Sequence, residues 1–298
     1  MNHYQDHTLE EFYPLAMSQI NYRVRSETAK DRVRRVERHI IPYFRTTKIK
    51  EITPLQLERW QFDLFRLRGA DQVRRCKHLF KAILNRAIVY EIIPANPLEA
   101  VATIREPRTN QRKIYTRDEV ERILNSAVGS VRLMILAIIS LGVRSGELVA
   151  LKFSDINWRN RTITIQRSMR KGELKETKTG QSRTVDIPIN LFNELVAYQT
   201  QYPTQEYIFI HKNGTPYREA SSFVRRHFKP LLERLNIEYK SLYSLRHTYA
   251  TLQLQGGQSI NYVAKQLGHS NARTTQEFYI KYLKNEEDLK RADKILSF

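Results

Sequence analysis

Two prolines and a polar, basic segment near residue 100 divide the chain into parts with different hydrophobic patterns. Pro94 and Pro97 end any helical pattern that precedes them. The stretch IREPRTNQRK that follows is polar and contains a proline, and we predict an interdomain linker at residues 106–112, with a surface loop inside one domain as the alternative. At about 150 residues per domain, 298 residues are also expected to form two domains.

Apolar residues before this break recur at helical spacing. Residues 26–40, a segment from residue 54 and residues 73–87 show this spacing, and residues 8–24 show it more weakly. Thr53, Pro54 and Gln56 carry the signature of a capped helix start. We therefore predict an all-helical domain at residues 1–105, with a core that includes the aromatic residues Trp60, Phe62, Phe65 and Phe80.

Helical and strand patterns alternate after the break. Thr116 and Glu119 form a second capping box, and Ser145 is expected to cap a short helix that ends at Leu151. Strands are predicted at residues 162–166 and 183–187, separated by a polar, lysine-rich stretch. Helices are predicted at residues 117–126, 130–141, 190–200, 219–235, 243–255, 259–267, 271–282 and 284–296. The predicted fold class is mainly α with a small antiparallel β-sheet (α+β), the second domain spanning residues 113–298.

The formal charge of the chain is +19, from 50 Lys and Arg residues against 31 Asp and Glu residues. The excess is +7 in residues 1–110 and +12 in residues 111–298, so both parts are basic. Such a charge would repel itself in a compact state without a polyanionic partner. Nucleic acid is therefore the favoured partner, and a basic but otherwise ordinary enzyme is the alternative.

Several classes of protein are disfavoured by the sequence. The longest apolar run, Leu133–Val143, is shorter than the ~20 residues that span a bilayer, and the N-terminus has no signal-peptide core. Cys76 is the only cysteine, which fits a reducing, cytoplasmic location. The chain has no GxxxxGK[ST], GxSxG or HExxH motif and no paired acidic residues of the DxD type, which argues against a metal-dependent nuclease or polymerase.

Five motifs in the second part are LGVRSGELVAL, TKTGQSR, YSLRHTYAT, LGHS and TTQEFY. In this order and at these spacings they resemble the tyrosine recombinase (phage integrase) family. The resemblance covers residues 113–290 and implies a tyrosine-recombinase catalytic domain. The helical first part looks like the core-binding, SAM-like DNA-binding domain of that family, on less specific grounds.

The resemblance implies a set of catalytic residues. Arg144 and Arg246 match the two arginines that stabilise the phosphate in the transition state, and a guanidinium group suits this role because it donates parallel hydrogen bonds and stays charged. Tyr279 matches the nucleophile, whose phosphotyrosyl bond conserves the phosphodiester energy. Lys178 matches the lysine that protonates the leaving 5′-hydroxyl, and His269 the histidine that binds the phosphate or positions the tyrosine.

Tyr243 departs from the pattern of the family, which usually has histidine at this position. A phenol with an ordinary pKa of about 10 is a poor general base near neutral pH. Either Tyr243 binds the phosphate or Tyr279 by hydrogen bonding alone, or the protein is an inactive copy. His247 is not a natural substitute, because one step along a helix turns a side chain by about 100°.

Each candidate also has a plainer interpretation. Arg144 could form only a helix salt bridge with Glu147, and Arg246 could be a surface or DNA-facing arginine. His269 could be a capping or core histidine. Neighbours of the same type compete with two other candidates: Lys171 and Lys175 with Lys178, and Tyr282 with Tyr279.

The resemblance implies a site-specific DNA recombinase that works through a 3′-phosphotyrosyl intermediate and a Holliday junction, in integration, excision or dimer resolution. Its expected partners are double-stranded DNA, further copies of the chain in a tetramer on paired sites, and accessory DNA-bending proteins. No metal or nucleotide cofactor and no membrane are implied, and the expected location is the bacterial cytoplasm, at the nucleoid. The alternatives are a catalytically impaired DNA-binding protein of the same fold and a type IB-like topoisomerase.

Overall fold

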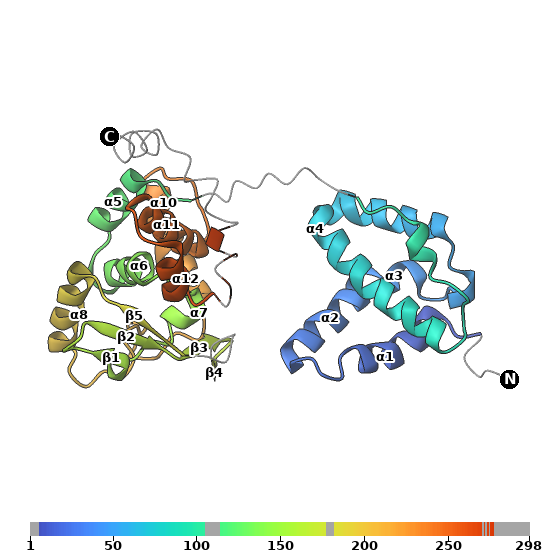
Figure 1. The fold of residues 1–298 in the computed structure, drawn as a ribbon, viewed down its shortest axis with the longest axis horizontal. Coiled ribbons are helices and arrows are strands. Elements are labelled where there is room, and N and C mark those ends of the chain that lie inside the picture. The colour runs from blue at the N-terminus through green and yellow to red at the C-terminus, as the bar shows by residue number, and fades with distance from the viewer. Residues whose placement is uncertain are drawn as a thin grey trace, which may run out of the picture. The chain divides into compact units, whose positions relative to one another are not determined.

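The computed structural model describes residues 6–104, 114–176 and 182–269, together with residues 271, 273, 275 and 276. The chain forms two compact units, Met1–Asn110 and Gln111–Phe298 (Figure 1). The described part of the first unit is helical, and the second combines helices with small antiparallel sheets. The predicted α+β fold class is therefore confirmed. The predicted linker at residues 106–112 lies outside the described residues, and the domain boundaries remain predictions.

The first unit packs its helices around an aromatic core. The rings of Trp60 and Phe80 meet edge to face with centroids 5.4 Å apart, and Phe44 lies 5.1 Å from Phe80. The Trp60 Nε1–H donates to the carbonyl of His39 at 2.6 Å, so the buried indole is satisfied. The elements are α1 (Leu9–Ile20), α2 (Ser26–His39), α3 (Ile41–Phe44), the 3-10 turn Ile49–Glu51, α4 (Pro54–Val89) and the 3-10 turn Pro97–Ala100.

Phe62 is not part of this core, so its prediction was wrong. It is 55% exposed, whereas Trp60 is buried. Both residues lie on α4, where two steps rotate a side chain by about 200°, so that Phe62 faces away from the core that Trp60 enters. The predicted capping box at Thr53 is confirmed, because the Thr53 N–H donates to Gln56 Oε1 at 2.9 Å and the Gln56 N–H donates back to Thr53 Oγ1.

Helix α4 contains a break at Gly69. Its backbone angles there are φ 75° and ψ 170°, which L-residues almost never adopt. The two helices that the sequence predicts in this region are the two halves of α4, and Gly69 sets the bend between them.

The second unit surrounds a buried helix, α6 (Gly129–Leu141), most of whose apolar residues are inaccessible. Helices α11 (Leu242–Gln255) and α8 (Ile189–Gln201) pack against α6 (Figure 1). Three strands form an antiparallel sheet in the order β1 (Ile156–Asn157), β2 (Thr162–Ile165) and β5 (Arg183–Asp186), with Ile163 opposite Val185. The other elements are α5 (Arg117–Ser126), α7 (Ser145–Leu148), the 3-10 turn Phe153–Asp155, β3 (Arg167–Arg170), β4 (Glu173–Glu176), α9 (Ser221–Phe223), the π-helical turn Val224–Phe228, α10 (Lys229–Arg234) and α12 (Ile260–Leu267).

Three local predictions differ from the structure. The polar stretch between the predicted strands contains the β3–β4 hairpin, whose turn residues Lys171 and Gly172 both have positive φ. The predicted helix at residues 219–235 widens into a π-helical turn. Helix α7 ends at Leu148, and its N-cap is Arg144 rather than Ser145, because Glu147 accepts the Arg144 backbone N–H at 2.9 Å. Among the described helices, none combines the length and apolar character needed to cross a bilayer.

Replacing Gly69 by alanine is expected to lower the free energy of unfolding of the first unit by about 1–3 kcal/mol, because a Cβ is strained at this φ and ψ. Helix propensity alone predicts the opposite sign, since alanine is favoured over glycine by about 1 kcal/mol. Urea unfolding followed by Trp60 fluorescence in a Trp158→Phe background measures the change. Ala70→Gly, which alters propensity alone, is the control, and a more stable Gly69→Ala protein would contradict the strained bend.

Candidate active site

Two helices of the second unit end on glycines beside the same buried cluster. Gly142 (φ 60°) caps the C-terminus of α6 and Gly268 (φ 66°) caps that of α12, and both glycines are left-handed. A Cβ on Gly142 would lie 2.5 Å from the ring of Tyr249, and one on Gly268 would lie 2.7 Å from Arg183 Cδ. Only glycine fits at either position, so the last carbonyl groups of both helices can approach the cluster closely.

Arg246 lies at the centre of the cluster on α11 and is 1% exposed. Its Nη1 donates to the carbonyl of Gly142 at 2.6 Å and its Nη2 to the carbonyl of Leu267 at 2.7 Å. These are carbonyl groups at helix C-termini, which lack partners within the helix and carry partial negative charge. Burial, followed by the charge of Arg144, lowers the pKa of Arg246 to about 10, so Arg246 is still a cation at neutral pH.

Glu147 is a buried carboxylate shared by two arginines. Its Oε1 accepts from Arg144 Nη1 at 2.7 Å, and its Oε2 accepts from Arg183 Nη2 at 2.7 Å. Burial alone would raise the pKa of Glu147, but the hydrogen bond and charge of Arg183, with those of Arg144, lower it to about 2. Glu147 is therefore ionised at neutral pH.

Arg144 keeps part of its guanidinium group accessible. The salt bridge to Glu147, which the sequence left as the plainer interpretation, is present. Its Nη2 has only a long contact of 3.4 Å with the carbonyl of Gly268, and the side chain is 25% exposed. The ion pair and an interaction with a phosphate group are therefore compatible.

His269 follows α12 and bridges Arg246 to Thr275. Arg246 Nη2 lies 3.2 Å from His269 Nε2, and Thr275 Oγ1 lies 2.8 Å from Nδ1. A guanidinium group has no acceptor, so Nε2 must accept and Nδ1 carries the proton. Burial and the charges of Arg246, Arg144 and Arg183 lower the pKa of His269 to about 4, which keeps its ring neutral.

Tyr243 lies one helical turn before Arg246 on the face of α11 that His247 also occupies. Arg246 Cζ is 5.9 Å from the centroid of the Tyr243 ring, and the rings of Tyr243 and His247 meet edge to face at 4.7 Å. Tyr243 is 38% exposed, whereas His247 is buried. The residue in the position of the usual histidine therefore keeps an accessible side chain beside the buried arginine.

Four of the six predicted site residues thus come together: Arg144, Tyr243, Arg246 and His269. The other two, Lys178 and Tyr279, lie outside the described residues. Sequence reasoning gave no role to Arg183, which binds Glu147 and lies against Gly268. Its only signal was its place as the last residue of the TKTGQSR motif.

Comparisons with known proteins match both parts of the chain. The profile described as the phage integrase family matches residues 113–286, and that described as the N-terminal SAM-like domain of phage integrase matches residues 8–65. The chain is 25% identical to a "Tyrosine recombinase XerC-like" of Caldanaerobacter subterraneus subsp. tengcongensis, covering 78% of this chain and 68% of that protein. It is 26% identical to a "Putative prophage phiRv2 integrase" of Mycobacterium tuberculosis, covering 82% and 68%.

Solved structures share the fold at lower identity. The Tn1549 transposon integrase in complex with transposon right end DNA has a TM-score of 0.79 at 19% identity, over 98% of this chain and 100% of that chain. A lambda integrase dimer bound to a COC′ core site has a TM-score of 0.77 at 16% identity, over 94% and 79%.

The His269 ring is expected to stay neutral, with the proton on Nδ1, from pH 8 to about 5, and to titrate near pH 4. Nitrogen-15 NMR of the ring measures this, and titration near pH 6.5 would contradict it. Because the folded-state pKa is lower than that of the unfolded chain, the unfolded chain binds more protons between about pH 6.5 and 4, and stability falls as the pH drops through this range. This fall should be shallower in His269→Gln, measured by urea unfolding.

Proposed function

The chain belongs to the phage integrase family, and we propose how this site-specific DNA recombinase cuts and rejoins its DNA. The proposal depends on one observation, that Arg144 and Arg246 reach the consecutive carbonyl groups of Gly268 and Leu267 at the end of α12. Two guanidinium groups brought together in this way, one of them partly exposed, form a positively charged site for a single phosphate group.

The scissile phosphate would bind at this site with its non-bridging oxygens facing Arg144 and Arg246. Negative charge on these oxygens increases as a fifth oxygen approaches phosphorus, so donors held in advance lower the barrier. Tyr279 attacks the phosphorus atom through its hydroxyl oxygen, the bond from phosphorus to the 5′-oxygen breaks, and the tyrosine is joined to the 3′-phosphate. Lys178 gives a proton to the 5′-oxygen, and the proton of the tyrosine hydroxyl leaves to a base or solvent.

Strand exchange is the reverse reaction with a different 5′-hydroxyl. That hydroxyl comes from the partner duplex, attacks the phosphotyrosyl bond and releases Tyr279, so phosphodiester energy is conserved. Two such rounds pass through a Holliday junction. The neutral His269 ring accepts a hydrogen bond from Arg246 and so orients the arginine for the phosphate.

Tyr243 would act as a hydrogen-bond donor in the place of the usual histidine. Its ring lies against Arg246 and the buried His247, and its accessible side chain can direct the hydroxyl toward a phosphate beside Arg246. This role needs no proton transfer, so an unreactive phenol suffices. The site is then active rather than a degenerate copy.

The partners follow from the relatives and from the charge. The lambda integrase tetramer bound to a Holliday junction has the same fold at a TM-score of 0.75 and 17% identity, which supports a tetramer on two duplexes here. Residues 1–105 would be the core-binding domain and residues 113–298 the catalytic domain, both basic enough to contact DNA. Accessory DNA-bending proteins are further candidate partners, and we infer a cytoplasmic location at the nucleoid, where the DNA substrate lies.

Replacing Tyr279 by phenylalanine is expected to abolish covalent attachment to DNA, because the attacking oxygen is lost. The full-length protein is incubated with a library of nicked duplexes of random sequence, and DNA that stays attached after denaturation is sequenced. The recovered sequence defines the site. Tyr282→Phe is the matched control and should retain attachment. If the wild type attaches no more DNA than Tyr279→Phe, the proposed reaction is wrong.

Removing the Tyr243 hydroxyl with Tyr243→Phe should slow single-turnover cleavage of the recovered site by about tenfold to a hundredfold, as expected for the loss of one hydrogen bond to a charged group. Tyr243→His should cleave at least as fast as the wild type. An inactive copy would instead show no cleavage in the wild type, and an unchanged rate in Tyr243→Phe would mean that the hydroxyl does not contact the reacting phosphate.

A further inference from the structure

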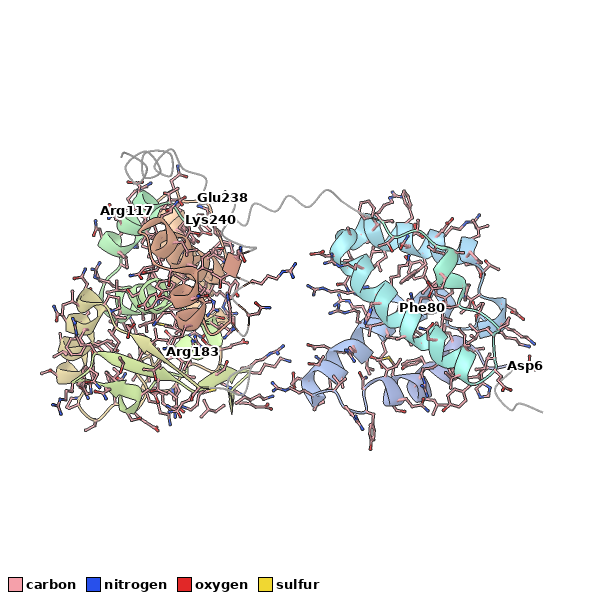
Figure 2. All side chains as sticks on the ribbon, in the orientation of Figure 1. Asp6, Phe80, Arg117, Arg183, Glu238 and Lys240 are labelled. Carbon is pink, nitrogen blue, oxygen red and sulfur yellow. The ribbon has the colours of Figure 1, made fainter. Side chains whose placement is uncertain are left out.

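Arg183, the first residue of β5, contacts the site through its whole guanidinium group (labelled in Figure 2). Its Nη2 and Nη1 donate to the two carboxylate oxygens of Glu147 at 2.7 and 3.2 Å, and its Nε donates to the carbonyl of Gln266 at 2.9 Å. All three nitrogens are engaged, and the side chain is only 10% exposed. Arg183 is therefore built to hold protein groups rather than DNA.

The two arginines on Glu147 are not equivalent. Arg183 binds the carboxylate through two nitrogens, whereas the Arg144 side chain binds it through Nη1 alone. Parallel donors make the first pair the stronger one. Since Arg183 offsets the negative charge of Glu147, the positive charge of Arg144 is not neutralised by this carboxylate and can attract another anion.

Arg183 also connects three elements of the site. It begins β5, it binds Glu147 of α7, and it binds the carbonyl of Gln266 at the end of α12. Gly268 packs directly on it, because a Cβ there would lie 2.7 Å from Arg183 Cδ and 3.0 Å from its Nε. The position of Arg183 therefore sets the distance between α7, which carries Glu147, and the end of α12, which precedes His269.

We propose that Arg183 is a positioning residue for strand cleavage, which offsets the charge of Glu147 and fixes it so that Arg144 is free and oriented to bind the scissile phosphate. This inference rests on the proposed function for the identity of that phosphate. The geometric part of the inference is that Arg183 holds Arg144 in place through Glu147, and it depends only on the contacts among these three residues.

The main test compares Arg183→Met with Arg167→Met. In the same unit, Arg167 binds both carboxylate oxygens of the buried Asp155, and its own side chain is 22% exposed. Its loss therefore also leaves a buried carboxylate without its arginine, and the mechanism assigns no role to either residue. Single-turnover cleavage of the recovered site is measured at saturating protein, and the dissociation constant is measured separately. We expect Arg183→Met to cleave about tenfold to a hundredfold more slowly than Arg167→Met, as for a small misplacement of a catalytic group, with an affinity within about threefold of it. Equal cleavage rates, or equal losses of affinity and cleavage, would overturn the proposal.

A second variant covers the case in which Arg183→Met fails to fold because it leaves a buried carboxylate poorly paired. Arg183→Met combined with Glu147→Gln removes both charges and should fold. In this double variant no carboxylate at residue 147 competes for the positive charge of Arg144. It should therefore cleave faster than Arg183→Met. If Arg183→Met does not fold, the double variant should cleave at no less than about a tenth of the wild-type rate. A lower rate would mean that Arg183 does not act by offsetting Glu147.

A neutral substrate tests whether Arg183 acts through charge at the phosphate. A methylphosphonate at the scissile position has one non-bridging oxygen replaced by a methyl group and carries no negative charge. If Arg183 serves to free the charge of Arg144, the deficit of Arg183→Met against Arg167→Met should shrink to under about threefold on this substrate. A deficit of the same size on both substrates would overturn the role in charge, because a purely structural defect does not depend on the charge of the substrate.

The geometric part is tested without DNA. The Nε–H signal of Arg144 is assigned by its loss in Arg144→Lys and followed by nitrogen-15 NMR in the full-length protein. It should shift and broaden in Arg183→Met and stay unchanged in Arg167→Met. An unchanged signal in Arg183→Met overturns the proposal even if cleavage is slow. If instead the wild type attaches to no DNA, the proposed reaction fails, and this measurement still decides whether Arg183 positions Arg144.

Discussion

The site depends on a buried guanidinium group that is held mainly by the ends of two helices. Arg246 donates to the carbonyls of Gly142 and Leu267 and to the neutral ring of His269, and none of these three partners is a carboxylate. Burying such a cation is costly unless acceptors surround it. Helix C-termini supply acceptors with partial negative charge but no full charge to compete with a phosphate. The cation is therefore stabilised without being neutralised, which is the property that phosphate binding requires.

The rest of the cluster follows from this arrangement. Helices α6 and α12 must end side by side, which explains the left-handed glycines at Gly142 and Gly268. The one described carboxylate that binds the arginines, Glu147, is shared between Arg144 and Arg183. Burial, together with the charges of Arg246, Arg144 and Arg183, lowers the pKa of His269 and keeps its ring neutral, so that Nε2 can accept from Arg246. The left-handed helix ends and the tautomer of His269 thus both serve the hydrogen bonds that hold Arg246.

Local signals in the sequence predicted the elements well. The capping boxes at Thr53 and Thr116 begin helices as expected, and the helices at residues 117–126 and 243–255 lie within one residue of their predicted bounds. The β3–β4 hairpin was missed because its strands, RSMR and ELKE, contain no β-branched or aromatic residue, unlike the predicted strands at β2 and β5. Phe62 was misplaced because residue type alone does not tell which face of a helix is buried. The four described site residues came from motif order, whereas the role of Arg183 depends on contacts between segments far apart in sequence, which no local pattern encodes.

The attachment of α12 to Arg246 has a thermodynamic consequence. If the end of α12 moved away, Arg246 would lose the carbonyl of Leu267 and the ring of His269 together, and Arg183 would lose the carbonyl of Gln266. Local opening of this helix would therefore deprive the guanidinium groups of Arg246 and Arg183 of these acceptors at the same time. Docking of α12 and assembly of the arginine cluster are therefore coupled, because the same hydrogen bonds serve both.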